Sequence, residues 1–524
     1  MAISVSERRS RGMAAIVAAA AIVAGILVRL HGAATYPLWL DEAYSAFAAD
    51  HPFAFIWRMV PQYETHPPVY YSMVRLWGLL TGHGLLARRM LGLLCGLATL
   101  WVAGAVAARL GRQTRMGARE RAWLIAATLI LVALQPLLVG MSRQVRPYPV
   151  MILVYALSLL PLLRLVADGV VRRPLDRVAI AGFFACEALM LWLHSLGPLF
   201  GLTMTLALAV AVLRPGLRRG DWAWLIGGQV IVGLLYLPAF LIMLHQARTW
   251  VKSGWVVFDA ADVPGTVAQI WLDWNSWACL IGGALAMAGA LLLLRRIGGV
   301  RLLGILLLMA VLPVLLSILL SATVSPVFLA RTLSPAAIPA LLLVALGLAW
   351  PGRRAWAALA GFVLVVGSMA GIDRELAKAG PPQDWYGALA WLEPRMVPGD
   401  VVWAYPNEGA LPLAYALRDQ QRVLPWRQVP APMPALASPG FHPTGSMGAV
   451  SLYPAQIDAL MRTSEARRPP TIWLLRLSPE LYDKGDVMLR ALERERAEVG
   501  HFQSRQIDLT GLRLKAPTAP NRSR

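Results

Sequence analysis

The chain has 524 residues, of which 57% are hydrophobic and only 15% are charged, and its mean hydropathy is +0.57. Soluble domains carry about 25% charged residues, so this composition excludes a soluble basic protein and favours a polytopic α-helical membrane protein. The formal net charge of +20 is of the kind found in nucleic-acid-binding proteins. Here, however, the arginines are scattered between apolar runs, and we expect no nucleic acid as a partner.

A membrane-spanning helix needs about 20 predominantly apolar residues, and eleven runs approach or reach that length. They are residues 13–30, 88–108, 122–140, 149–166, 178–195, 197–213, 223–244, 276–294, 301–321, 335–350 and 355–371. The first run follows three arginines, and no clear cleavage site comes after it, so we interpret it as an uncleaved span. A further run, 67–82, begins with two prolines and contains Arg75, and we expect it to lie along the outer membrane interface.

The distribution of basic residues predicts the orientation, because loops on the inner side of a membrane are enriched in lysine and arginine. With the N-terminus inside, the inner connections hold twenty of these residues and the outer connections before the last span hold nine. Treating 67–82 as a span would move the five arginines of residues 109–121 to the outer side. We therefore predict about eleven spans and a first outer loop at residues 31–87.

The composition changes after Gly371, where the long apolar runs end. Residues 401–405 and 472–475 are typical of short buried strands, and three segments have helical spacing. These segments are 384–395, 409–418 and 485–498. The sequence therefore predicts a transmembrane domain at residues 1–372 and a C-terminal extracytoplasmic α/β domain at residues 373–524.

In this topology, acidic, basic and aromatic side chains gather on the outer face, with Asp41 and Glu42 in the first loop. A carboxylate among apolar neighbours can act as a general base towards a hydroxyl group, and arginines can hold the oxygens of a phosphate. Residue types alone are equally compatible with ordinary structural roles. Acidic residues are also favoured at the start of a helix, and arginines near the ends of spans also contact lipid headgroups.

Four segments in order along residues 13–371 resemble a known family. They are PLWLDEAYSAF with THPPVYYSMVRLW, then SRQVRPY, then LWLHSLG, and finally PVFLARTLSPAAIPALLLVALGL. They are similar to the outer-loop motifs of family 39-type glycosyltransferases of the GT-C fold, which include bacterial aminoarabinose transferases and protein O-mannosyltransferases. Two positions depart from the family pattern. Gln144 replaces the usual acid of the second loop, and Thr332 replaces the tyrosine that usually follows Arg331.

The resemblance implies a GT-C fold and transfer of a sugar from a polyprenyl-phosphate donor to a lipid, glycan or protein acceptor. Transfer would take place on the extracytoplasmic face of a bacterial inner membrane and would invert the anomeric carbon. Asp41 would be the general base, with Glu42 beside it as a second catalytic residue. The implied donor-binding residues are His66, Tyr70, Arg143, Arg146, Tyr148, His194, Trp255 and Arg331. Among them, Arg146 and Arg331 would hold the phosphate.

Two other functions are also compatible with the sequence. A transporter or flippase of lipid-linked sugars would account for Glu187, an acid near the middle of an apolar run, although no repeated halves are visible. A non-catalytic glycan-binding protein would account for Gln144. The histidines and acids of the first loop have no metal-ligand spacing, so we expect no metal and no other cofactor. A divalent cation is the alternative, because some GT-C relatives use one and others do not.

Overall fold

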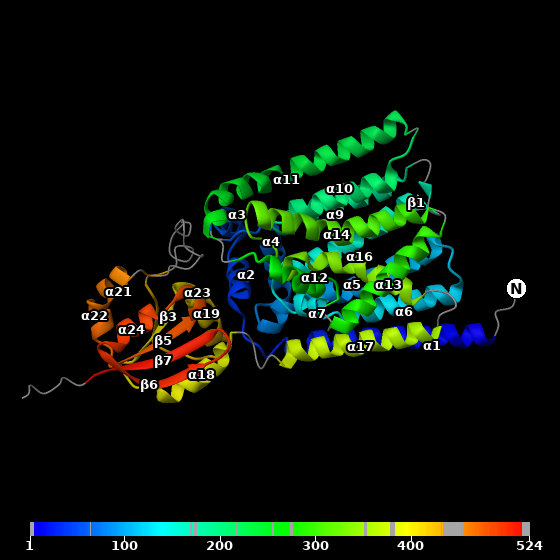
Figure 1. Ribbon diagram of the computed structural model, residues 1–524. Helices are drawn as coiled ribbons and strands as arrows, with labels where there is room; N and C mark the ends of the chain where they lie inside the picture. Colours follow the sequence, from blue (N-terminus) through cyan, green and yellow to red (C-terminus); the bar gives the residue numbers. More distant parts are fainter. Residues whose placement is uncertain are drawn as a thin grey trace, which may run out of the picture.

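The computed structural model describes most of the chain. The described residues are 5–62, 64–167, 170–171, 175–215, 217–253, 256–272, 276–296, 298–349, 354–377, 383–430, 432, 452 and 454–515. A bundle of long helices forms the larger part, and a domain built on a β-sheet lies at one end of it, opposite the end that carries the N-terminus (Figure 1).

The bundle consists mainly of apolar helices. Its helices are α1 (Val5–Leu30), α5 (Leu85–Gln113), α6 (Ala118–Leu134), α7 (Pro136–Ser142), α8 (Tyr148–Leu165), α9 (Arg177–Leu193), α10 (Gly197–Val212), α11 (Arg219–Ser253), α12 (Val263–Trp271), α13 (Ser276–Leu294), α14 (Gly299–Thr323), α15 (Ala330–Leu333), α16 (Ala337–Leu348) and α17 (Arg354–Ala377). A two-stranded hairpin, β1 (Val166–Ala167) and β2 (Val170–Val171), follows α8.

Within the described residues, seven helical segments are long and apolar enough to cross a membrane, or eight if the bent pair α6 and α7 is one span. The seven coincide with the predicted runs 13–30, 88–108, 149–166, 223–244, 276–294, 301–321 and 335–350. The remaining predicted runs are also helical, but α9 and α10 have only 17 and 16 residues. The chain is therefore a multi-pass helical membrane protein, and the number of eleven crossings remains a prediction.

The run 122–140 forms two helices instead of the single helix predicted. Proline cannot donate the backbone hydrogen bond that would continue a helix, and α6 ends just before Pro136, with α7 turned by 62°. The Gln135 side chain caps α7 by accepting the Leu138 N–H at 2.6 Å. Arg29 of α1 donates to the carbonyls of Val132 and Ala133 at the end of α6.

The segment predicted to be the first outer loop contains three helices, α2 (Leu40–Asp50), α3 (Phe53–Arg58) and α4 (Val69–Thr81), with a short 3-10 turn η1 (Val60–Gln62) between the last two. Helix α4 has 13 residues, which is too short to cross a hydrocarbon core of about 30 Å. Its Leu79 and Leu80 are exposed while Tyr70 and Tyr71 are buried. This two-sided helix has the character expected of a helix at the interface, although its placement in a membrane stays a prediction.

The C-terminal domain is an α/β domain with a five-stranded sheet in the order β4-β3-β5-β7-β6. Strand β3 is parallel to β4 and β5, whereas β7 is antiparallel to β5 and β6. The strands are β3 (Val401–Tyr405), β4 (Trp426–Gln428), β5 (Thr471–Leu477), β6 (Arg496–Gln503) and β7 (Ile507–Leu514). The helices are α18 (Trp385–Leu392), α19 (Ala410–Asp419), α21 (Pro454–Met461), α22 (Ser464–Arg467), α23 (Pro479–Tyr482) and α24 (Val487–Glu493), with 3-10 turns η4 (Glu393–Arg395) and η5 (Asn407–Gly409).

The structure gives the ends of two elements near predicted boundaries. Helix α17 continues to Ala377, past residue 372, and the division into domains at that residue stays a prediction. The helix predicted at 485–498 is only α24, and β6 begins at Arg496. That prediction was wrong at its C-terminal end because most of the first residues of β6 are exposed and lack the alternation that marks a half-buried strand.

Candidate active site

The two predicted catalytic acids lie in the first turn of α2 but have different surroundings. Trp39 is the N-cap, and Asp41 and Glu42 follow in the first turn, where the helix dipole favours negative charge. The Asp41 side chain is 25% exposed, whereas that of Glu42 is 1% exposed. Of these two carboxylates, only that of Asp41 is therefore accessible to solvent.

Glu42 forms a closed ion pair with Arg89 of α5. The carboxylate accepts from Arg89 Nε at 3.1 Å and from Nη2 at 2.6 Å. It also accepts the Val145 backbone N–H at 2.9 Å. Arg89 donates in addition to the carbonyls of Ala33, Tyr36 and Pro37. Because the pair is buried and both partners are bonded on several sides, it ties the start of α2 to α5 and to the loop before Arg146.

Arg146 is the centre of the site. It is 4% exposed and lies just before α8, in the loop that α7 directs towards α2. Its Nη1 donates to the Asp41 carbonyl at 3.1 Å and to Glu64 Oε2 at 3.3 Å. Its Nη2 lies 3.9 Å from Asp41 Oδ2 and donates to His66 Nε2 at 2.8 Å.

Arg331 approaches Asp41 from the opposite part of the chain. It lies on α15, and its Nη1 is 3.6 Å from Asp41 Oδ2. Its guanidinium group also stands 5.5 Å from the centre of the Trp39 ring. Both guanidinium groups are thus farther from the Asp41 carboxylate than the roughly 3.2 Å limit of a good hydrogen bond. Two positive charges therefore compensate the charge of Asp41, but neither arginine forms a short hydrogen bond with its carboxylate.

His66 and His194 are adjacent, with ring centroids 4.1 Å apart. A guanidinium group can only donate, so His66 Nε2 accepts from Arg146 and the proton lies on Nδ1. His194 Nδ1 accepts the Leu196 N–H at 3.0 Å, which places its proton on Nε2. Both of these N–H groups are buried and have no hydrogen-bond partner among the described residues.

Burial and nearby positive charge keep both histidines neutral. Burial lowers the pKa of His66 well below its usual value, and the charges of Arg146 and Arg331 lower it further. For His194, burial again lowers the pKa most, followed by His66 and the same two arginines. The site therefore presents two neutral N–H donors beside two permanent positive charges.

The other predicted donor-binding residues are placed as follows. Tyr148 is buried in the first turn of α8, with its ring centroid 5.8 Å from that of His194. Tyr70 is buried in the first turn of α4. The Arg143 side chain lies against the turn at Gly32, where a Cβ on that glycine would be 2.8 Å from Nη2. Trp255 lies outside the described residues.

Three residues at the site were not among the predicted site residues. Glu64 pairs with Arg146, Arg89 pairs with Glu42, and Glu408 of the C-terminal domain accepts the Tyr44 hydroxyl at 2.9 Å. Glu64 precedes His66 by two residues, so it could have been predicted from the same motif as His66. The sequence around Glu408 gives no such indication, because Glu408 is far from the motifs in sequence and comes close to them only in the folded structure.

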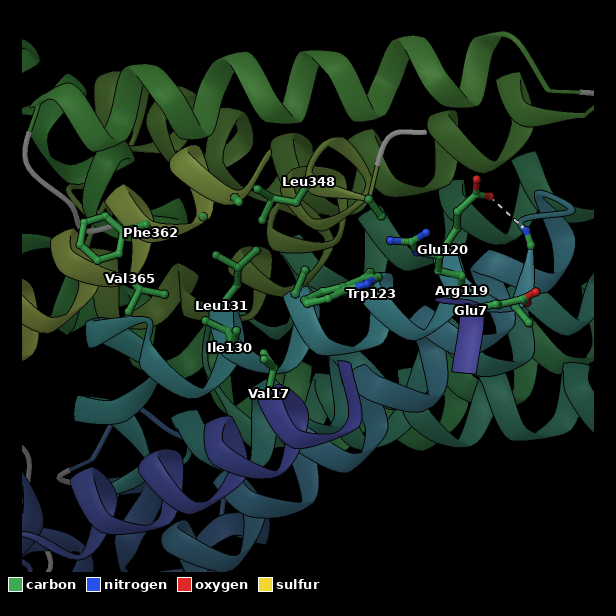
Figure 2. Close-up of a pocket in the computed structure, with 16 residues that line it drawn as sticks. Glu7, Val17, Arg119, Glu120, Trp123, Ile130, Leu131, Leu348, Phe362 and Val365 are labelled. Atoms are coloured by element: carbon green, nitrogen blue, oxygen red, sulfur yellow. Dashed lines mark hydrogen bonds between the residues drawn. The ribbon is translucent and has the colours of Figure 1, made fainter. Parts of the chain in front are cut away.

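A cavity of about 670 Å³ opens elsewhere, between α1, α6, α16 and α17 (Figure 2). Its wall is mostly apolar and includes Trp123, Leu131 and Phe362, while Arg119 and Glu120 lie at one end. None of the predicted site residues lines it. The described residues also contain no cluster of three or more histidines, cysteines or acids suited to a metal.

Glu187, the acid near the middle of the predicted run 178–195, joins three helices. Its Oε1 accepts from Thr205 of α10 at 2.6 Å and from Gln229 of α11 at 3.2 Å. Gln229 also donates to the Thr205 hydroxyl at 3.1 Å. These contacts give Glu187 a packing role between α9, α10 and α11.

The sequence matches no protein-family model and no curated protein. The structure is similar to that of ArnT from Cupriavidus metallidurans in the apo state, with a TM-score of 0.56, 13% identity, and 95% of this chain and 98% of that chain covered. ArnT bound to undecaprenyl phosphate gives a TM-score of 0.54 at 13% identity, with 95% and 98% covered. The apo oligosaccharyltransferase of Archaeoglobus fulgidus gives 0.51 at 12% identity, covering 97% of this chain and 75% of that chain.

The likeness to ArnT extends over nearly the whole of both chains. It therefore includes the helical bundle, the segment with α2, α3 and α4, and the C-terminal domain, while at these identities it concerns the fold alone. It confirms the fold expected from the loop motifs: the chain is a multi-pass membrane protein with the GT-C glycosyltransferase fold and a C-terminal α/β domain.

Proposed function

We propose that this protein is a membrane glycosyltransferase that moves a sugar from a polyprenyl-phosphate donor to a lipid, glycan or protein acceptor. The observation that carries the proposal is the cluster around Asp41, in which Arg331 and Arg146 lie 3.6 and 3.9 Å from one carboxylate oxygen. ArnT, which has a similar fold, has been solved with undecaprenyl phosphate, a ligand of the class that two arginines and two neutral N–H donors would hold.

In the proposed reaction, Asp41 takes the proton of an acceptor hydroxyl as its oxygen bonds to the anomeric carbon. The bond from that carbon to the phosphate oxygen breaks, and its electron pair leaves with the polyprenyl phosphate. Attack opposite the leaving group inverts the anomeric carbon. Arg146 and Arg331 offset the negative charge that builds on the phosphate, and the His66 and His194 N–H groups donate to donor oxygens.

Glu42 has a positioning role in this proposal. Its bonds to Arg89 and to the Val145 N–H hold the start of α2 against the loop that carries Arg146. The distance between Asp41 and Arg146 therefore depends on Glu42, although Glu42 itself is too enclosed to reach a substrate.

The proposed location is the extracytoplasmic face of a bacterial inner membrane. The excess of arginine in the connections at the opposite end of the bundle supports this orientation. The first loop and the C-terminal domain lie together at one end (Figure 1), so the donor headgroup would be held on the face where the domain is found.

The test compares cells that lack the protein with cells that regain it as wild type or as Asp41→Asn. Mass analysis of envelope glycolipids and glycoproteins should show one sugar lost without the protein and restored by the wild type. Asp41→Asn should restore less than about one-hundredth of the transfer rate, the usual effect of removing a general base. The purified variant in detergent should still bind undecaprenyl phosphate. Asp458→Asn, at an exposed ion pair with Arg494, is the matched control and should behave as wild type.

Full activity of Asp41→Asn would overturn the proposed mechanism. A transporter would instead change the location of a lipid-linked sugar without transferring it, and purified protein in detergent, where no transport is possible, would then catalyse no sugar transfer. A non-catalytic glycan-binding protein would bind the donor lipid and leave the sugar on it.

A further inference from the structure

The C-terminal domain holds the helix that carries Asp41 at three places. The Leu40 N–H donates to Gln383 Oε1 at 2.9 Å, at the beginning of α2. The Tyr44 hydroxyl donates to Glu408 Oε1 at 2.9 Å, in the middle of α2. At the end of α2, Asp50 Oδ2 accepts the Tyr415 hydroxyl at 2.8 Å.

Apolar packing reinforces these hydrogen bonds. Leu40 packs against the core of the C-terminal domain as well as against the core of the bundle. In the other direction, Leu411 and Tyr415 of α19 belong to the core of the bundle. Helix α19 contacts α2, and Figure 1 shows the two side by side. Interfaces that share a core are more rigid than the polar contacts that usually join domains within a chain.

Glu408 lies at a distinctive place in its own domain. It follows β3 directly, in η5, and thus sits at the carboxyl end of a strand that is parallel to both of its neighbours. In open α/β sheets this edge is where ligands bind. Here the edge faces Tyr44 of α2, and Glu408 is 5% exposed. In this domain that edge contacts the helix of the proposed base.

The charges around Glu408 support its place in the same site. Burial raises the pKa of Glu408 to about 8, the negative charges of Asp41 and Glu64 contribute, and the hydrogen bond from Tyr44 opposes the shift. At neutral pH the domain therefore places an uncharged carboxyl group near the two acids. Ionised, it would add a third negative charge to a site that has to accept a phosphate.

We propose that the C-terminal domain is a permanent part of the catalytic unit and that Glu408 is a positioning residue. Through Tyr44 it fixes α2, and so determines where the Asp41 carboxylate stands relative to Arg146 and Arg331. This inference rests on the proposed role of Asp41, and it assigns a role to a domain that supplies no reacting group to the proposed transfer step.

The test uses full-length variants. Tyr44→Phe and Glu408→Ala each remove the hydrogen bond, whereas Glu408→Gln keeps an oxygen that can accept from Tyr44. Tyr386→Phe is the matched control, because Tyr386 donates to Asp419 at 3.2 Å within the same domain and not to α2. Three quantities are measured. They are the rate at which the lost sugar reappears in the envelope after induction, the affinity of the purified variant for undecaprenyl phosphate, and its thermal midpoint.

We expect Tyr44→Phe and Glu408→Ala to lower the rate about tenfold, because each loses roughly one hydrogen bond that aligns α2. The affinity for undecaprenyl phosphate should change less than about twofold. Glu408→Gln should restore at least half of the wild-type rate, and Tyr386→Phe should match the wild type. Restoration by glutamine separates positioning from a chemical role, because glutamine cannot exchange a proton.

Two results would overturn the inference. The first is wild-type rates in folded Tyr44→Phe and Glu408→Ala proteins. The second is an equal loss in Glu408→Gln and Glu408→Ala, which would make Glu408 a chemical group instead of a positioning one. The outcome for Asp41→Asn distinguishes the two proposals. If that variant is inactive and Glu408→Ala is fully active, only the role of the domain fails; if Asp41→Asn is active, the proposed function fails.

Discussion

At the scale of single residues, the site depends on two neighbouring acids that play different parts. Side chains one residue apart on a helix point about 100° apart, so the first turn of α2 can direct Glu42 inward and leave Asp41 partly exposed. Glu42 is 2.6 Å from Arg89 in a closed pair, while Asp41 is 3.6 and 3.9 Å from its arginines. The Asp41 carboxylate, which has no short hydrogen bond to either arginine, can form a new hydrogen bond when a substrate arrives. The Glu42 carboxylate, which is buried and bonded to Arg89, cannot.

Glu42→Gln should therefore be mainly a stability variant. Removing the charge leaves Arg89 buried without its counter-ion, which typically costs about 3–5 kcal/mol. The thermal midpoint should fall clearly, and it should fall much further than for Asp41→Asn. Asp458→Asn breaks an ion pair in which both side chains are about half exposed or more and should cost under about 1 kcal/mol. An unchanged midpoint in Glu42→Gln would show that Glu42 is not a structural anchor.

The two histidine N–H groups lead to a prediction about donor binding. His194→Phe keeps an aromatic ring in place but removes the Nε2 donor, so the affinity for undecaprenyl phosphate should fall about tenfold, as for one lost hydrogen bond to a charged group. The pH dependence of binding between about pH 5 and 8 should be the same for the wild type and His194→Phe, because burial and nearby arginines lower the pKa of both histidines and leave the phosphate monoester of the lipid, with a pKa of about 6, as the group that titrates. His501→Phe, at a side chain that is 42% exposed, is the control. Titration calorimetry or fluorescence in detergent measures both effects.

At the scale of secondary structure elements, Pro136 and the glycines of α5 bring Arg146 to α2. The break between α6 and α7 turns the chain by 62°, and the loop after α7 then passes close to α5. At Gly92 the two backbones approach so closely that a Cβ would lie 2.9 Å from the Ser142 carbonyl oxygen and 3.0 Å from that of Gln144. The position of Arg146 therefore depends on the absence of a side chain at Gly92.

Gly92→Ala should displace this loop, since a carbonyl oxygen of the backbone cannot move as easily as the end of a side chain. We expect a loss of about 1–3 kcal/mol from overpacking together with reduced sugar transfer. Gly104→Ala in the same helix is the control, because its nearest neighbour would be Leu129 Cδ2 at 3.5 Å, an ordinary contact. Alanine favours helix at that position by about 1 kcal/mol. Equal thermal midpoints for the two variants would argue against a constrained loop.

At the scale of the whole molecule, local patterns predicted much more of the bundle than of the site. The apolar helices and the strands at 401–405 and 472–475 are predictable because each depends on the pattern of apolar residues within a short stretch of the sequence. Loop motifs indicated Arg146, Arg331 and His66, which lie together with Asp41 in the structure. The partners that fix them could not be predicted in this way. Tyr44 and Glu408 are 364 residues apart, and a residue that docks one domain on another has no pattern of its own.

The docking of the two domains should depend on pH through Glu408. Burial raises its pKa to about 8 from an ordinary value of 4.5, so above pH 4.5 the folded protein retains a proton that the unfolded chain releases. The free energy of unfolding should therefore fall as pH rises from about 4.5 to about 8, by at most about 1.4 kcal/mol per unit, and then level off.

Glu408→Gln removes this titration while keeping an acceptor for Tyr44. Its thermal midpoint in detergent should be close to that of the wild type at about pH 5, and the variant should become the more stable of the two as pH approaches about 8. Glu465→Gln is the matched control, since Glu465 is 59% exposed and should show the same difference from wild type at every pH in this range. A constant difference for Glu408→Gln would mean that this carboxyl group ionises normally when the domains are docked.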